Sequence, residues 1–334
     1  MRSVNLGSQG LKVSAEGLGC MGMSSVYGPS DDTESLATLA RARELGITLF
    51  DTAEVYGPYS NETLLGKAFA GHRSEVLLST KLGFVIAPDG TQVIDATGTP
   101  ALDSSPEHLT SAIEGSLSRL NTDYVDLVYL HRIDPAIPIE DSIGALSELV
   151  SAGKVRFIGI SEASADTIRR AHAVHALTAV QTEYSLFERG VETNDVLSTV
   201  KELGIGFVSY SPLGRGFLTG TIANTASLDA ADFRRFDPRL QGEHLDQNLA
   251  VVAAIREVAE KKGVKPSQLA IAWTISQGTV PIPGTRRVHY IEENAAAADI
   301  ELTPADLEQL NSAAPIGSVS GERYSTSLLD QLGR

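Results

Sequence analysis

The sequence predicts a single (β/α)8 TIM barrel domain over residues 1–334, with a β-hairpin at its N-terminus. Eight short runs rich in Val, Ile, Leu and Phe alternate with helical patterns along the chain. The runs are almost continuously apolar, which is typical of parallel strands that are covered on both faces. The length of 334 residues also suits such a barrel. An open doubly wound sheet is the alternative arrangement of the same pattern.

The predicted elements follow in order from the N-terminus. Residues 3–13 read as two short strands around a turn that contains glycine. The eight apolar runs span residues 14–20, 47–53, 76–83, 125–131, 155–161, 179–185, 205–211 and 279–285. Between them, Ser105 and Pro106 are expected to form the N-cap and first residue of a helix. Glycines such as Gly153 and Gly204 stand where helices are expected to end.

Two connections are longer than the usual 2 to 6 residues of a barrel. One covers residues 84–104 after the third strand, and the other covers residues 213–245 after the seventh. Both follow the carboxyl ends of strands, which form the active-site face of a barrel. We therefore expect both long loops to shape a substrate pocket.

Residues 17–22 read GLGCMG and match the G-x-G-x-x-G fingerprint of dinucleotide-binding folds. That fingerprint requires a helix that opens within the glycines and receives the pyrophosphate at its N-terminus. No helical pattern begins before Ser30, and Gly28 with Pro29 blocks a helix that would run on from the motif. We interpret the three glycines as the tight end of a strand and expect any dinucleotide to bind by another fold.

The composition excludes several classes of function. The formal net charge of −15 argues against nucleic acid and against an anionic membrane surface as partners, because both attract basic proteins. No apolar run suits a signal peptide or a membrane span, so a cytoplasmic protein is expected. Cys20 is the only cysteine, which excludes an internal disulfide, and no metal site is expected.

Polar side chains close most of the predicted strands. They are Asp51, Lys81, His131, Ser161, Gln181 and Tyr210, and Tyr56 lies just beyond Asp51. Charged groups at the ends of apolar strands cost free energy, because they are drawn out of water. Their presence there therefore indicates a function. In a barrel the carboxyl ends of the strands meet at one face, so these residues predict an active site there.

The chain resembles the aldo-keto reductase superfamily in seven motifs that each fall at the end of a predicted strand. They are FDTAEVYG (50–57), LSTKLG (78–83), VDLVYLHRID (125–134), GIS (159–161), VQTEYSL (180–186), YSPLGRGFLTG (210–220) and PIPGTRR (281–287) with EEN (292–294). The resemblance covers nearly the whole chain and keeps the order of the motifs. It implies a reductase that transfers a hydride to the carbonyl of an aldehyde or ketone.

By this resemblance the catalytic tetrad falls on Asp51, Tyr56, Lys81 and His131. Tyr56 is expected to be the general acid, because the alkoxide left by hydride transfer needs a proton. Lys81 would stabilise the anion of Tyr56, and Asp51 would keep the lysine protonated. His131 would orient the carbonyl oxygen through a hydrogen bond. A small carbonyl compound is the expected partner.

The resemblance further implies NADPH/NADP+ as cofactor, with the nicotinamide on Tyr210 and its carboxamide held by Ser161 and Gln181. The predicted cofactor-binding residues are Gly22, Met23, Ser161, Gln181, Tyr210, Ser211, Leu213, Gly214, Arg215, Gly216, Gly284, Thr285, Arg286, Glu293 and Asn294. Arg286, with Arg287 beside it, is expected to favour NADPH by binding its 2′-phosphate. Tyr27, Phe84 and Phe187 are candidate substrate walls.

One departure from the family concerns Glu162, which stands where many relatives carry Asn. An ionised carboxylate accepts hydrogen bonds and cannot donate them, so this residue has no assigned cofactor role.

Two other functions remain open at this stage. A Schiff-base aldolase would use Lys81 as the nucleophile. A regulatory subunit that senses NADPH without turnover would keep the cofactor site alone. Cofactor binding and turnover of a simple aldehyde distinguish the three.

Overall fold

In the computed structural model, which describes residues 1–333, eight parallel strands form one curved sheet. In spatial order they are β10 (Val280–Pro281), β9 (Gly206–Tyr210), β8 (Ala179–Glu183), β7 (Val155–Ser161), β6 (Val125–Leu130), β5 (Leu77–Leu82), β4 (Leu49–Asp51) and β3 (Leu18–Gly19). The two edges of the sheet meet: the backbone N–H of Gly17 donates to the oxygen of Pro281 at 2.9 Å, and Gly19 pairs with Gly284. The predicted (β/α)8 barrel is therefore confirmed.

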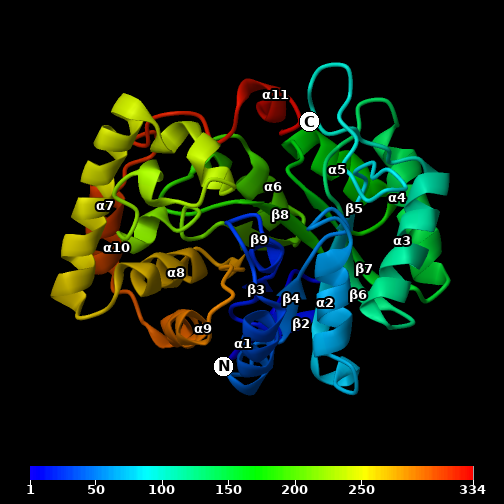
Figure 1. The fold of residues 1–334 in the computed structure, drawn as a ribbon, viewed down its shortest axis with the longest axis horizontal. Coiled ribbons are helices and arrows are strands. Elements are labelled where there is room, and N and C mark those ends of the chain that lie inside the picture. Colours follow the sequence, from blue (N-terminus) through cyan, green and yellow to red (C-terminus); the bar gives the residue numbers. More distant parts are fainter. Residues whose placement is uncertain (334) are drawn as a thin grey trace.

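Helices cover the outside of the sheet (Figure 1). They are α1 (Asp32–Glu44), α2 (Ser60–Ala68), α3 (Pro106–Leu120), α4 (Ile139–Ser151), α5 (Ala165–Val174), α6 (Val196–Glu202), α7 (Gly242–Lys262), α8 (Pro266–Ser276), α9 (Val288–Ala295), α10 (Pro304–Ala313) and α11 (Thr326–Leu329). Ser105 caps α3 as expected, since its hydroxyl accepts from the N–H of His108. Within the described residues, no helix is both long and apolar enough to cross a membrane.

The N-terminal hairpin is confirmed as β1 (Ser3–Asn5) and β2 (Lys12–Ser14), which pair antiparallel. The side chain of Leu6, in its turn, is buried against the start of β9 at Gly206. Because parallel strands share one direction, a hairpin at their amino ends leaves the carboxyl ends open to ligands.

The expected strands at both ends of the barrel are shorter than the apolar runs from which they were predicted. The first run, 14–20, gives only the two residues of β3, and Ser14 belongs to the hairpin. The run 279–285 gives only Val280 and Pro281, because Pro281 and Pro283 lack the N–H that a longer ladder needs. After Gly22 the chain continues through a short 3-10 turn, and α1 begins only at Asp32, so no Rossmann helix follows the glycines.

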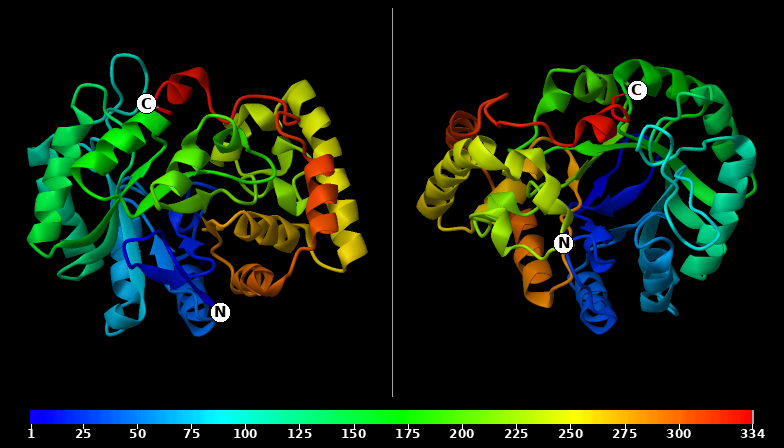
Figure 2. Two further views of the ribbon diagram at one scale, coloured as in Figure 1. Left: turned by 180° about the vertical axis from the view of Figure 1, so that it is seen from behind. Right: turned by 45° about the horizontal axis from the view of Figure 1, so that its top comes forward.

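Both long loops lie where they were expected. The loop between β5 and α3 contains its own antiparallel contacts, for example between Phe84 and Leu102. The loop between β9 and α7 contains four short 3-10 helices. The C-terminal segment, red in Figure 2, returns from α10 across this face to α11. All three segments border the carboxyl ends of the strands.

Candidate active site

A cavity of about 740 Å³ opens at the carboxyl ends of the strands, a volume within the range of small-molecule sites. Seven strands each contribute a residue to its lining, from within the strand or directly after it: Gly19, Asp51, His131, Ser161, Gln181, Tyr210 and Ile282. Its other walls come from the loop after β9, the start of α8, α9 and the C-terminal segment. The strand ends that the sequence marked by polar residues thus surround one cavity.

Lys81, on β5, lies fully buried behind the wall of this cavity. Its ammonium forms an ion pair with Asp51 and donates to the backbone oxygen of Thr52 at 2.8 Å. The third contact joins Nζ to the phenol oxygen of Tyr56 at 3.1 Å. An ammonium has three N–H donors, so these three acceptors satisfy it completely. Asp51 also accepts from the hydroxyl of Ser79 at 2.8 Å, which fixes the carboxylate.

The protonation states follow from burial and from these charges. Burial raises the pKa of the Tyr56 phenol, although the charge of Lys81 acts against that rise. Burial alone would lower the pKa of Lys81, but the charges of Asp51 and Tyr56 raise it above its usual range. At neutral pH the tyrosine is therefore a protonated acid beside a permanently charged lysine.

His131 faces the same group from β6. Its ring meets the ring of Tyr56 edge to face, with centroids 5.9 Å apart, and the ring of Phe84 packs on it at 4.9 Å. Burial, and then the charges of Arg132 and Lys81, hold the pKa of His131 well below its usual range. The imidazole is thus neutral, and its buried Nδ1 has no hydrogen-bond partner. Unpaired buried nitrogens of this kind are rare in proteins.

Most of the expected cofactor-binding residues line the cavity. They are Gly22, Ser161, Gln181, Tyr210, Ser211, Leu213, Arg215, Gly216, Gly284, Thr285, Glu293 and Asn294. Met23 instead belongs to the hydrophobic core, and Met21 takes its place on the wall. Gly214 and Arg286 also lie outside the lining. The amide of Gln181 donates to Asp51 at 2.9 Å, so this side chain joins the end of β4 to β8 across the floor of the predicted site.

Comparison with known proteins agrees with this geometry, because residues 17–315 match the family described as Aldo/keto reductase family. The chain belongs to this family. It is similar to the glycerol dehydrogenase AKR11B4 from Gluconobacter oxydans, with 26% identity over 93% of this chain and 94% of that chain and a TM-score of 0.83.

Two further solved structures are similar. The thermostable aldo-keto reductase Tm1743, in complex with the inhibitor epalrestat, shares 27% identity over 94% of this chain and 100% of that chain, with a TM-score of 0.73. The aldo-keto reductase AKR11C1 from Bacillus halodurans, in its holo form, shares 25% identity over 98% of this chain and 99% of that chain, with a TM-score of 0.77. Membership of the family makes this protein an oxidoreductase.

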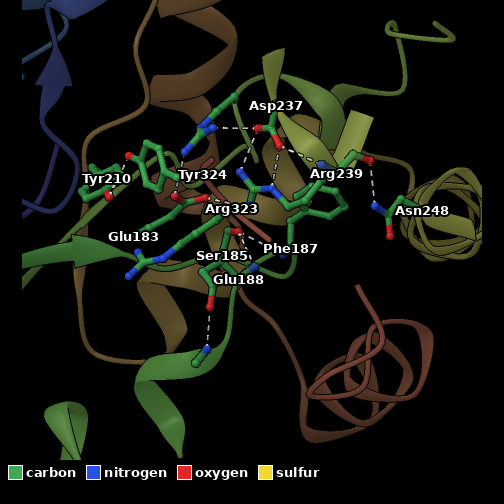
Figure 3. A network of polar contacts seen from close by, with 12 residues as sticks. Glu183, Ser185, Phe187, Glu188, Tyr210, Asp237, Arg239, Asn248, Arg323 and Tyr324 are labelled. Atoms are coloured by element: carbon green, nitrogen blue, oxygen red, sulfur yellow. Dashed lines mark hydrogen bonds and ion pairs between the residues drawn. The ribbon is translucent and has the colours of Figure 1, made fainter. Parts of the chain in front are cut away.

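In this aldo/keto reductase, Glu162 is engaged by protein groups. Its carboxylate pairs with the guanidinium of Arg323 through two contacts, of 2.9 and 2.7 Å. It also accepts from the hydroxyl of Tyr210 at 2.7 Å and from the N–H of Glu183 at 3.1 Å. The hydroxyl of Tyr324 lies 3.2 Å from that of Tyr210 (Figure 3). Glu162 therefore fastens the C-terminal segment to the wall of the reductase cavity.

Arg215, expected beside the pyrophosphate, is held by a buried charge network. Its guanidinium donates to Asp237 at 2.7 Å and lies 3.3 Å from Glu183. Arg239 pairs with the same two carboxylates (Figure 3). Burial would raise the pKa of Glu183, but Arg239 and Arg215 bring it down to about 2. This network fixes the loop after β9, which lines the cavity, at a defined position.

The sequence reasoning missed several wall residues of this reductase, among them Arg132, Lys265 and Tyr324. Arg132 directly follows His131, so its position beside the site was visible in the motif VDLVYLHRID. Lys265 precedes a proline that starts α8, a signal for a helix N-terminus at the cavity. Tyr324 had no sequence signal, because only the fold brings the C-terminal segment to the strand ends. Phe187 is buried under Arg239 and against Phe217, outside the lining.

Proposed function

We propose that this oxidoreductase reduces the carbonyl of an aldehyde or ketone, with NADPH as the hydride donor and Tyr56 as the general acid. The observation that carries the proposal is the contact of the buried Lys81 ammonium with both Asp51 and the Tyr56 hydroxyl. A charged lysine beside a phenol lowers the cost of forming the tyrosinate. The similarity to AKR11B4, titled a glycerol dehydrogenase, supports chemistry between alcohols and carbonyls.

The residues at the wall fit a bound dinucleotide. The lining of the cavity includes Asp51, Tyr56 and His131 of the proposed tetrad as well as Lys265, Glu293 and Asn294. When bound, the nicotinamide would supply the hydride to the carbonyl carbon. Ser161 and Tyr210, both on the wall, would hold the nicotinamide, and residues 211–216 would follow the pyrophosphate.

The side chains of this site then handle the proton. The substrate oxygen would lie against the Tyr56 hydroxyl and the neutral imidazole of His131. As negative charge grows on that oxygen, Tyr56 donates its proton, and Lys81 stabilises the tyrosinate that remains. Asp51 keeps Lys81 protonated throughout. The aromatic rings of Tyr56 and Phe84 beside His131 keep water away from this group.

The aldolase alternative requires a neutral amine at Lys81, since only the free amine attacks a carbonyl. Burial alone would lower the pKa of Lys81, but Asp51 and Tyr56 outweigh this effect and raise it. Lys81 therefore stays protonated, which disfavours a role as nucleophile. A regulatory subunit would retain cofactor binding and lack turnover. Neither alternative explains why Tyr56 contacts Lys81.

Tyr56→Phe tests the proposal. The variant lacks the proton donor, so we expect kcat for aldehyde reduction to fall about 100-fold or more. Cofactor affinity, measured by quenching of protein fluorescence, should stay within about threefold, because the phenol acts on the transition state. Tyr124→Phe makes the same chemical change outside the cavity and serves as control. Wild-type turnover in Tyr56→Phe contradicts the assignment, and borohydride trapping of substrate on Lys81 would establish the aldolase.

Preference for NADPH is proposed to depend on Arg286. One of its nitrogens donates to the backbone oxygen of Gly28 at 3.2 Å, and no carboxylate pairs with it among the described residues. Arg287 instead lies 3.6 Å from Glu34. A further cation, Lys265, lines the cavity and pairs with Glu293 at 2.5 Å. Because Glu293 already neutralises Lys265, Arg286 remains the better phosphate ligand.

Arg286→Ala and Lys265→Ala separate the two cations. We expect Arg286→Ala to weaken NADPH binding about tenfold or more, the usual strength of a charge-assisted contact, and to leave NADH binding unchanged. Dissociation constants for both cofactors check this. A loss confined to NADPH in Lys265→Ala, with Arg286→Ala unaffected, would move the phosphate contact to the lysine.

A further inference from the structure

Arg132 is a half-buried cation on the wall of the cavity, directly after His131. One nitrogen of its guanidinium donates to the backbone oxygen of His131 at 2.7 Å and lies 3.5 Å from the hydroxyl of Ser161. Both acceptors are uncharged. A guanidinium has five N–H donors, so most of them have no acceptor among the described residues.

The other cations of the wall are all paired with carboxylates. Arg215 contacts Asp237 at 2.7 Å, Arg234 contacts Asp232 at 2.6 Å, and Lys265 contacts Glu293 at 2.5 Å. Over residues 1–333, Arg132 has no carboxylate within 4.0 Å. Arg132 is therefore the exception among the cations that line this cavity.

The charge of Glu162 acts on Arg132, but other groups hold this carboxylate. Its Oε1 accepts from Arg323, from Tyr210 and from the N–H of Glu183, and its Oε2 accepts from Arg323. Glu162 therefore stabilises the C-terminal segment and leaves Arg132 without a carboxylate in direct contact. Arginine does not lose its proton in proteins, so Arg132 stays charged. A charged group that is partly removed from water is stabilised by an anionic partner.

The position of Arg132 decides where that anion lies. Its charge acts on the phenol of Tyr56 and on the imidazole of His131, the two groups that face the reacting carbonyl. Among the described residues, Arg132 makes no hydrogen bond to residues 211–216, which are proposed to follow the pyrophosphate, or to Lys265. An anion at Arg132 therefore belongs to the carbonyl substrate and not to the cofactor phosphates.

We propose that Arg132 is a specificity-determining residue and that the preferred substrates are aldehydes or ketones that carry a carboxylate near the carbonyl. This inference rests on the proposed carbonyl reduction and names its substrate class. The carboxylate would take a pair of hydrogen bonds from the guanidinium, a geometry for which arginine is suited.

Matched substrates test the proposal on turnover. 3- and 4-Carboxybenzaldehyde are compared with the formylbenzamides of the same shape, which lack the charge. For the isomer that the wild type reduces faster, we expect kcat/KM of the carboxybenzaldehyde to exceed that of the matching amide at least tenfold. Arg132→Gln should abolish this preference. Arg132→Lys should restore part of it, and Arg170→Gln, an exposed arginine outside the cavity, should leave it unchanged. Absence of any preference in the wild type overturns the proposal.

Two further measurements separate the possible failures. If Arg132 instead held the nicotinamide, Arg132→Gln would raise the NADPH dissociation constant and slow both substrates of a pair equally, which also overturns the proposal. Calorimetric binding of benzoate does not depend on turnover. About tenfold weaker benzoate binding in Arg132→Gln, with Arg170→Gln unchanged, would support the anion site even if no aldehyde were reduced. Equal benzoate affinity in all variants would refute it.

Discussion

Among single residues, Glu54 is a buried carboxyl that the proposed chemistry does not use. It lies in the turn between Asp51 and Tyr56, and its Oε1 accepts from the backbone N–H of Gly83 at 2.9 Å. Burial, and then the neighbouring charge of Glu62, outweigh this hydrogen bond and raise its pKa to about 8. The folded protein therefore holds a proton here at a pH where the unfolded chain has lost it.

This difference predicts the pH dependence of stability. A carboxyl whose folded pKa exceeds its unfolded value of about 4.3 stabilises the fold fully below pH 4. That contribution declines as the pH rises toward 8. Glu54→Gln keeps the acceptor for Gly83 and removes the titration, so its Tm should fall less than the wild-type Tm between pH 5 and pH 8. Glu257→Gln, an exposed carboxyl, is the control. Parallel Tm curves for Glu54→Gln and the wild type would disprove the pKa shift.

At the scale of elements, the C-terminal segment is tied to β7 by a few specific contacts. Arg323 pairs with Glu162, the N–H of Gly333 donates to the backbone oxygen of Glu162 at 2.9 Å, and the ring of Tyr324 lies under Arg215 at 4.4 Å. Glu162 itself has a positive φ of 56°, which turns the chain sharply after β7. Strain of this kind persists only where surrounding contacts hold it.

A double-mutant cycle on Glu162 and Arg323 measures this attachment. Removing one partner leaves the other charge with little access to water, which typically costs about 3–5 kcal/mol. Each single Gln variant should therefore lose more free energy of unfolding than half of the loss in the double variant. Hydrogen exchange over residues 321–333 should accelerate in all three variants. The exposed pair Arg169 and Glu202 provides the comparison, with a coupling of about 1 kcal/mol or less. Equal coupling in both pairs would show that the segment is held by other contacts.

At the scale of the whole molecule, the charge is unevenly distributed. The protein carries a formal net charge of −15, yet Arg132, Arg215, Arg234 and Lys265 all line one cavity. Local cations there act against the overall negative field, which would favour the anionic dinucleotide and the carboxylate substrate proposed above. The closed barrel makes this possible, because parallel strands bring residues from distant parts of the sequence to one face (Figure 1).

Much of this organisation was predictable from local patterns. Apolar runs separated by helical patterns indicated the strands, and the polar residues that close them indicated the site, because strand direction alone determines which face they share. Asp51, Lys81 and His131 were identified in this way, and the motif FDTAEVYG added Tyr56. The rejection of the glycine fingerprint also followed from local sequence, since Gly28 and Pro29 prevent the helix that it needs.

The sequence by itself therefore determined the barrel and the strand ends at which the proposed tetrad lies, since both depend on neighbours along the chain. Only the tertiary structure decided which charges are paired. Glu162 and Arg323 meet across 161 positions of the chain, and Lys265 meets Glu293 from another helix. Ion pairing depends on distances in space, and a linear pattern does not contain them. For that reason Arg132, one letter after a predicted catalytic histidine, became distinctive only when every neighbouring cation was seen to have a partner.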